Sequence, residues 1–291
     1  MRNQTDARAT RVLEDYEIRA SVPSVFATEA KAGASERYEF LPTSSILSGM
    51  RESGWMPVEA QEQGASIQNR GHQKHMLRFA RMSDLEKFAA QLEPGRHRID
   101  YKNPLATRMD IIVVNSHDRS SGYQLFGSPY RLVCYNGLVI SDAVMQHMSI
   151  RHVGFKPEKV VQATLGMANE IPAVMEMIAG WQDRELTDAE RAELAERALG
   201  LRWADKSKAP IRPQMLLEPR RAEDGGDDLW RTWNVVQENL LKGGVQDREL
   251  RYQARAENRR APAAARGVIA IDEKLRINRA LWDLGESFIE G

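Results

Sequence analysis

Apolar residues change their spacing near position 156 of this 291-residue chain, and the change limits the folds open to it. Before that position, apolar residues alternate with polar ones at 75–81 and run without interruption at 109–115. These patterns are typical of strands covered on one face or on both. Beyond it, apolar residues recur every three or four positions, as in amphipathic helices. We therefore expect an α+β fold with a mixed, mostly antiparallel N-terminal sheet, flanking helices and a helical C-terminal region.

Shifts in composition predict the domain organisation. The first residues are polar, and charged, proline-bearing segments interrupt the C-terminal half. Whether the parts form one domain or two stays open. We predict a flexible N-terminal arm (1–36), a β-rich domain (37–155), a helical hairpin packed on it (156–203) and a helical C-terminal region (204–291) with an arginine-rich loop at 245–267.

Turn and cap residues predict the limits of several elements. Residues 37–41 alternate like a strand, and Thr43 or Ser45 is placed to cap the helix that follows. The turn residues at 116–122 predict a β-hairpin. Asn136 and Gly137, between two apolar runs, predict a second hairpin or a helix end.

Helical features dominate the second half. Thr187 with Glu190 three residues later forms a capping-box pattern, and Pro172 is expected to kink a long helix that starts at Pro157. Three tryptophans have apolar partners at helical spacing, which favours a place in the core: Trp230, Trp233 and Trp282.

The cysteine count and the termini indicate a cytoplasmic protein. A single cysteine, Cys134, excludes an internal disulfide and lies in an apolar run, so we expect it to be buried. The N-terminus lacks the apolar region of a signal peptide. No stretch approaches the ~20 apolar residues that cross a bilayer, so no membrane partner is expected.

No complete active site is recognisable, and we lean against an enzyme. Ser116, His117 and Asp118 stand together, but consecutive residues on an extended strand point to opposite faces and do not converge as a triad. A hairpin turn whose side chains bond their own backbone is the favoured interpretation. The histidines lack metal-site spacing, and phosphate-binding glycine motifs are absent from the sequence. We predict no catalytic residue, no metal and no cofactor.

The chain has no net charge, because 41 lysines and arginines balance 41 aspartates and glutamates. Positive charge that could attract a polyanion is therefore confined to local patches. A groove for a polynucleotide therefore depends on patches. The alternatives are solvated surface charge or, for the C-terminal patch, disorder without function. Nine candidate contacts lie in the sheet half: Lys74, Arg78, Lys102, Arg108, His117, Arg119, Arg131, Arg151 and Lys156. On strand 75–81, Arg78 is expected to face water, as is Lys74 just before it. Five more candidates lie in the arginine-rich segment, where arginine and tyrosine also suit stacking on unpaired bases: Arg251, Tyr252, Arg255, Arg259 and Arg260.

Several short segments along the chain together form a recognisable pattern. The segments are Ser35-Glu36-Arg37-Tyr38, Leu41-Pro42-Thr43, Val114-Asn115-Ser116-His117-Asp118, Arg131-Leu132-Val133-Cys134, Asn136-Gly137-Leu138-Val139, Asp228-Leu229-Trp230 and Asn234-Val235-Val236-Gln237-Glu238-Asn239. Together they resemble the phage- and plasmid-carried domain-of-unknown-function family numbered 932. The resemblance extends from Tyr38 to Trp282, and it implies a mobile-element context rather than an activity. Proteins of this kind are similar to phage single-strand annealing recombinases, which have a bent sheet against a helix.

The resemblance and the basic patches together predict a single-stranded DNA-binding protein of a phage, plasmid or integrated element that binds without sequence preference. Strand annealing, and assembly of identical subunits into a ring or filament, extend this prediction. Two alternatives stay open. One is an enzyme that acts on nucleic acid through His117 and Asp118, and the other is a non-catalytic partner or inhibitor of a host protein.

Overall fold

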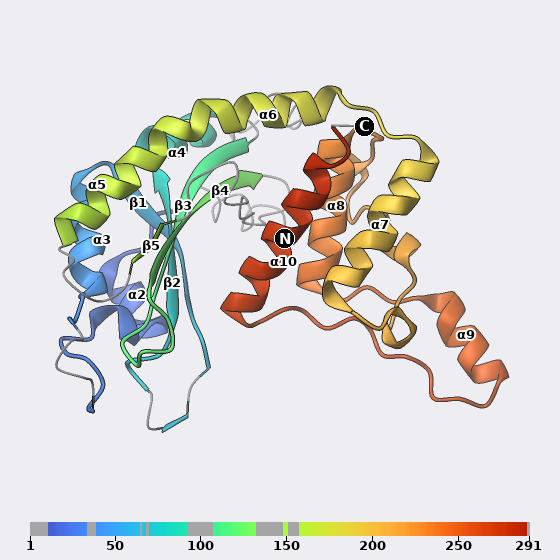
Figure 1. Cartoon of the computed structure of the whole chain (residues 1–291), viewed down its shortest axis with the longest axis horizontal. Helices are drawn as coiled ribbons and strands as arrows, with labels where there is room; N and C mark the ends of the chain where they lie inside the picture. The colour runs from blue at the N-terminus through green and yellow to red at the C-terminus, as the bar shows by residue number, and fades with distance from the viewer. Residues whose placement is uncertain are drawn as a thin grey trace. The chain divides into compact units, whose positions relative to one another are not determined.

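The fold is known from a computed structural model of the chain. Contacts between residues divide the chain into two compact units, Met1–Pro172 and Ala173–Gly291 (Figure 1). The boundary falls inside the segment 156–203 that was predicted as one helical hairpin. The structure describes residues 11–33, 39–64, 66–67, 70–91, 107–131, 148–150 and 157–289.

The first unit is built on an antiparallel sheet. The strand order is β1-β2-β3-β4-β5, so each strand pairs with its neighbours in sequence. Every pairing between described strands is antiparallel, and the α+β prediction is confirmed. The strands are β1 (Trp55–Glu62), β2 (His75–Arg81), β3 (Thr107–Asn115), β4 (Tyr123–Arg131) and β5 (Met148–Ile150).

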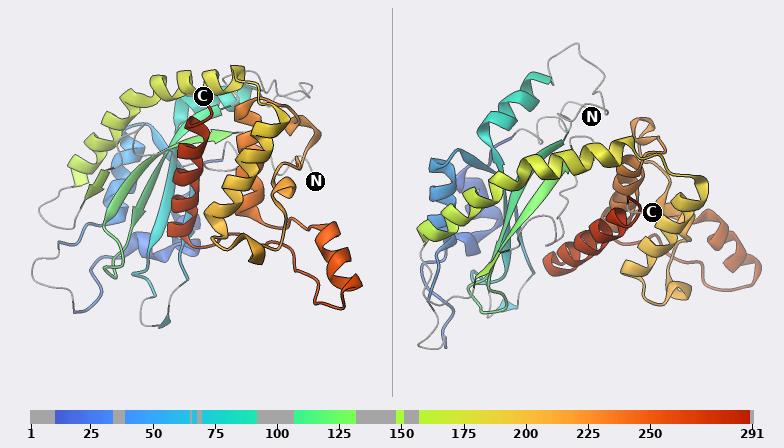
Figure 2. Two further views of the ribbon diagram at one scale, coloured as in Figure 1. Left: turned by 45° about the vertical axis from the view of Figure 1, so that its right-hand side comes forward. Right: turned by 45° about the horizontal axis from the view of Figure 1, so that its top comes forward.

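Helices cover one face of this sheet. The described helical elements of the unit are α2 (Asp15–Ser21), the 3-10 turn η1 (Pro23–Phe26), α3 (Thr43–Glu52), α4 (Met82–Gln91), α5 (Pro157–Met167) and the 3-10 turn η4 (Ala168–Glu170). Helix α3 contacts β1, and α5 contacts α3. Figures 1 and 2 show α2, α3 and α5 on the same side of the sheet.

The central strands are buried on both faces. All nine residues of β3 are buried, as the uninterrupted run Ile111–Val114 predicts. Six of the seven residues of β2 are also buried, although its alternating pattern predicts one solvent-facing side. The uninterrupted apolar run therefore predicts the burial of β3 correctly, whereas the alternation in β2 does not predict the burial of its second face.

The N-terminal segment differs from the flexible arm that the sequence predicts. Helix α2 and turn η1 lie within it, and Ile18, Val22 and Val25 are buried in the core. The backbone N–H of Leu13 also donates to the carbonyl of Pro57 in β1, at 2.7 Å. Burial of three apolar side chains supplies the free energy that orders this segment.

Residues 39–41 are not a strand, contrary to the prediction for 37–41, of which residues 37 and 38 lie outside the described part. The carbonyl of Leu41 accepts a hydrogen bond from the side chain of Asn115, at 3.2 Å, instead of from a neighbouring strand. Helix α3 then starts at Thr43 with Pro42 as its N-cap residue and no side-chain cap. The predicted cap is therefore wrong, because Thr43 turns its side chain into the core.

The second unit is helical. Its elements are most of α6 (Ile171–Asp183), α7 (Asp188–Arg202), the 3-10 turns η5 (Lys206–Lys208), η6 (Pro213–Leu216) and η7 (Ala222–Asp224), and the helices α8 (Leu229–Lys242), α9 (Arg248–Ala256) and α10 (Ile271–Glu286). Helix α8 is its centre, because all residues from Leu229 to Leu241 except Arg231 are buried.

Four tryptophans form the core around α8. The rings of Trp181 and Trp282 stack at 4.6 Å, and those of Trp230 and Trp233 stack at 5.9 Å. All four are at most 1% exposed, which confirms the core position predicted for the last three. Gly285 makes the packing possible, since a Cβ atom there would lie 2.4 Å from Trp181.

Helix boundaries in this half follow local chemistry. Thr187 Oγ1 accepts from the N–H of Glu190 at 3.3 Å while Glu190 accepts from the N–H of Thr187 at 2.7 Å, which confirms the capping box. Turn η4 interrupts the long helix just before Pro172, which has no N–H to donate to the carbonyl four residues earlier.

Two predictions fall on residues outside the described part of the chain: the second hairpin at Asn136 and Gly137, and the buried position of Cys134. Across the residues that are described, none of the helices combines the length and the apolar character needed to span a bilayer.

Candidate nucleic-acid interface

Two of the predicted sheet arginines lie in a buried ion-pair cluster. Arg78 donates to Glu59 at 2.8 Å and to Ser128 Oγ at 2.9 Å, while Arg108 donates to both oxygens of Asp110 at 2.7 and 3.1 Å. The side chains of Arg78, Arg108 and Asp110 are at most 5% exposed. The expectation that Arg78 faces water is wrong, because its side chain is buried between acceptors on two other strands, β1 and β4.

The structure describes the side chains of some, but not all, of the other sheet candidates. Lys74 is buried as well, contrary to the prediction. Arg131 is the last residue of β4, and its side chain is outside the described part. The remaining three candidates also fall outside it: Lys102, Arg151 and Lys156.

The turn between β3 and β4 bonds its own backbone, as predicted. Ser116 Oγ donates to the carbonyl of Ser121 and accepts from its N–H, both at 2.9 Å. Asp118 accepts a backbone hydrogen bond within the same turn. Arg119 has a left-handed backbone (φ 69°), is exposed, and donates to the carbonyl of Gly33 at 2.5 Å.

His117 belongs to a cluster of five fully buried polar residues, here called the histidine–threonine cluster: Ser24, Thr43, His75, Asn115 and His117. Thr43 Oγ1 is its centre. It lies 2.8 Å from His75 Nε2, 2.9 Å from Asn115 Nδ2 and 3.4 Å from His117 Nε2. Ser24 Oγ lies 3.0 Å from His75 Nδ1.

Hydrogen-bond partners fix the tautomer of His75. Its Nδ1 lies 2.9 Å from the carbonyl of Gln73, so Nδ1 carries the proton and Nε2 accepts from the Thr43 hydroxyl. Burial lowers the pKa of His75 to about 4, against the opposing effects of the Gln73 bond and the Asp118 charge. The cluster therefore holds a neutral imidazole near pH 7 and ties η1, α3, β2 and β3 together.

The five C-terminal candidates all lie in one projecting arm of the second unit. We call residues 246–264 the arginine arm; it contains α9 and an irregular return segment. Its two ends meet in a short stem of two backbone hydrogen bonds. The N–H of Gly244 donates to the carbonyl of Ala265 at 2.7 Å, and the N–H of Ala265 donates to the carbonyl of Val245 at 2.9 Å. Figures 1 and 2 show α9 standing away from α7, α8 and α10.

Asp247 anchors the arm. Arg212 donates to its carboxylate from Nε at 2.7 Å, from Nη2 at 3.0 Å and from the backbone N–H at 3.0 Å. The same carboxylate caps α9 by accepting from the N–H of Leu250 at 3.0 Å. Burial alone would raise the pKa of Asp247, but the bonds from Arg212 and Leu250 outweigh it and hold the pKa below its usual value.

The outer face of α9 is cationic and aromatic. Arg248, Tyr252 and Arg255 follow one another at helical spacing and are exposed, and Tyr252 is 71% exposed. Ala254, on the opposite side, is buried. This orientation directs two guanidinium groups and one phenol ring into solvent.

Most of the arm's positive charge is not neutralised locally. The arm has five arginines and three acids. Arg259 pairs with Glu257, and Asp247 is engaged by Arg212 outside the arm. Within the described part of the chain, the side chains of Arg248, Arg255 and Arg260 form no ion pair. Their exposed guanidinium groups are suited to phosphate oxygens.

The structure thus brings together the C-terminal candidates and buries Arg78, Arg108 and His117 elsewhere. The candidates predicted from the sequence omit Arg248, although its i, i+4 spacing from Tyr252 is visible there. They also omit Thr43 and His75, which are 32 residues apart and have no local signal of their contact.

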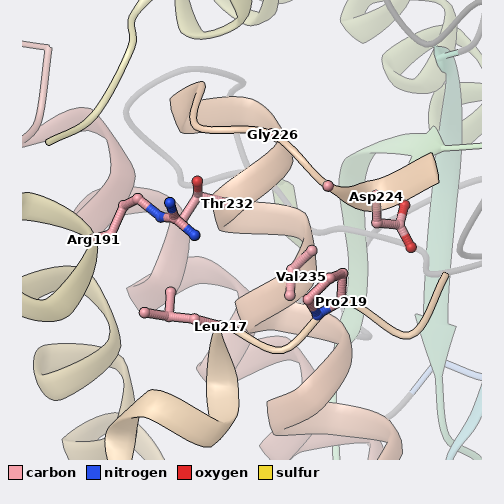
Figure 3. Close-up of a pocket in the computed structure, with 8 residues that line it drawn as sticks. Arg191, Leu217, Pro219, Asp224, Gly226, Thr232 and Val235 are labelled. Atoms are coloured by element: carbon pink, nitrogen blue, oxygen red, sulfur yellow. The ribbon is translucent and has the colours of Figure 1, made fainter. Parts of the chain in front are cut away.

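A small pocket of about 30 Å³ lies in the second unit beside α8 (Figure 3). Arg191 and Thr232 contribute polar atoms to it, and Leu217 and Val235 contribute apolar walls. Thr232 Oγ1 and Arg191 Nε are buried without a hydrogen-bond partner among the described residues. No three His, Cys, Asp or Glu side chains converge as metal ligands anywhere in the described ranges.

Comparisons with known proteins agree with the resemblance found in the sequence. The profile of a family described as "Domain of unknown function (DUF932)" matches residues 32–282. The chain is similar to two proteins of Escherichia coli (strain K12), UPF0380 protein YfjQ and UPF0380 protein YafZ, at 31% identity over 283 residues in each case. Each alignment covers 97% of this chain and 93% of the relative. No solved structure matches the chain.

Proposed function

Because the chain belongs to domain-of-unknown-function family 932, whose description names no activity, we propose a function from the surface of the molecule: single-stranded DNA binding through the arginine arm. The observation that carries the proposal is the set of exposed arginines on an anchored, projecting helix. Guanidinium groups bind phosphates by paired hydrogen bonds and charge, without reading base sequence. The binding we propose is therefore sequence-independent.

The arm has the features that such binding needs. Its cations lie within one short segment, so several phosphates of one strand can be contacted together. Its anchor through Asp247 and Arg212 orders the helix before a ligand arrives, which reduces the entropy lost on binding. Buried Arg78 and Arg108 have their guanidinium groups engaged by carboxylates, so the proposal assigns them no phosphate contact.

Strand annealing is the extension of this proposal, together with assembly into a ring or filament and a role in a phage, plasmid or integrated element. A single arm covers only a few nucleotides, so pairing of two long strands requires several subunits that hold them side by side. This extension rests on the resemblance to annealing recombinases and on no contact in the described structure. Sizing the protein with and without unpaired DNA tests it.

Binding is tested by fluorescence anisotropy of a labelled mixed-sequence oligonucleotide over a range of salt concentrations. The test variant replaces four arginines of the arm by glutamine: Arg251, Arg255, Arg259 and Arg260. If each contacts one phosphate, the slope of log affinity against log salt falls in magnitude by about 3, since each phosphate contributes ~0.7 on single strands. Absence of binding by the wild-type protein at low salt would refute the proposal.

A matched control removes the same charge from other surfaces of the second unit. Four cations there are exposed or half-buried and are already paired with acids: Arg197, Lys206, Lys208 and Arg276. Their replacement by glutamine should leave the salt slope near that of the wild type. Equal loss in both variants would show that only net charge matters, and the arm would then have no special role.

A further inference from the structure

An exposed tyrosine lies between two arginines on the outer face of α9. Tyr252 is 71% exposed, while Arg248 lies one helical turn before it and Arg255 nearly one turn after it. Ala254 is buried on the other side of the helix. Rotation of α9 about its axis, which would cover the phenol ring, would expose this alanine and is therefore unfavourable. The Tyr252 side chain is therefore open to solvent, with an exposed arginine one turn away on either side.

From this arrangement we infer that Tyr252 is the residue that selects unpaired bases, by stacking on one base while Arg248 and Arg255 hold the phosphates on either side. The inference rests on the proposed function and deepens it, because arginines alone bind any polyanion. A tyrosine ring stacks on every base and so adds no sequence preference. In a duplex the faces of the bases are already stacked on one another, and the ring finds no partner there.

The arginines and the tyrosine contribute to binding in different ways. The arginine side chains supply charge that acts on single strands, duplexes and inorganic polyphosphate alike. Tyr252 contributes through its aromatic ring, so its contribution requires an accessible base. Removal of the ring should lower affinity for single strands and leave binding to duplex and polyphosphate unchanged.

The experiment compares Tyr252→Ala, Tyr252→Phe and the wild-type full-length chain on three probes: a single-stranded oligonucleotide, its hairpin duplex, and inorganic polyphosphate. Loss of one stacked base predicts a decrease of about 5- to 150-fold in single-strand affinity for Tyr252→Ala. Tyr252→Phe keeps the ring and should bind within a few-fold of the wild type. Since the ring is exposed, neither substitution should unfold the protein, which circular dichroism checks.

A spectroscopic readout reports stacking directly. An oligonucleotide carrying 2-aminopurine loses fluorescence when that base stacks, so quenching should occur with the wild type and Tyr252→Phe and be absent with Tyr252→Ala. Single-strand affinity that is unchanged in Tyr252→Ala, or lost equally on duplex, overturns the inference and leaves arm binding intact. A wild-type chain that binds none of the three probes at low salt overturns the inference and the proposed function together.

Discussion

Acidification should destabilise the first unit through His75. The imidazole is fully buried, and its pKa is lowered from 6.5 to about 4 in the folded protein. Between these two values the unfolded chain binds the proton and the folded chain does not, so stability falls as the pH falls. From about pH 7 to about pH 4.5 the difference in proton binding by this one group lowers the free energy of unfolding by about 2 kcal/mol, since each pKa unit is worth about 1.4 kcal/mol.

The variant His75→Gln isolates this effect, because glutamine keeps polar atoms near Thr43 and cannot titrate. It should be less stable than the wild type near neutral pH, since the bond to Thr43 at 2.8 Å is altered. Its further loss on acidification should be smaller than that of the wild type by about 2 kcal/mol. Other titrating groups are common to both proteins and cancel in the difference.

Hydrogen exchange with mass spectrometry of peptides from β2 and β3 is the suitable assay, because it measures the first unit apart from the second. Exchange is compared at both pH values after correction for the intrinsic rates. His72→Gln, which removes a half-buried imidazole just before β2, is the control and should follow the wild type. If His75→Gln loses as much stability on acidification as the wild type does, the histidine–threonine cluster is not the acid-sensitive element.

Gly285→Ala should lower the melting temperature, because the new methyl group lies 2.4 Å from Trp181 and overpacking costs about 1–3 kcal/mol. Gly180→Ala is the control: nothing lies within 4 Å of its added Cβ, and calorimetry should show a gain of up to about 1 kcal/mol in the helix. Asp247→Asn keeps the cap but removes the charge pair with half-exposed Arg212, so about 1–2 kcal/mol of anchoring should be lost. Trypsin should then cut the arginine arm about 5- to 30-fold faster, and unchanged cleavage would show that the pair does not hold the arm.

Local signals in the sequence predict much of the fold. The run Ile111–Val114 identifies the central strand, the capping box at Thr187 marks the start of α7, and the turn at 116–122 is a hairpin as expected. In each case the residues that decide the structure are neighbours in the chain. The spacing of these residues in the sequence is therefore enough to predict the strand, the helix start and the hairpin.

Interactions between distant residues account for the failures. Arg78 appears solvent-facing from alternation alone, yet its acceptors are Glu59 and Ser128, 19 and 50 residues away on other strands. Thr43 looks like a cap but binds His75 in the core. Of the candidate site, the arginine-rich segment could be predicted from composition, whereas its helix, its stem and its anchor at Arg212 required coordinates.

The stem of the arginine arm makes the arm a replaceable part of the chain. Because the backbone at Gly244 and Val245 meets the backbone at Ala265, the main chain enters and leaves the arm at almost the same point. A tight turn in place of residues 246–264 would bridge that point without displacing α8 or α10, and loop-closure entropy changes little with loop length. Changes of length or charge within this segment should therefore leave the tryptophan core as it is.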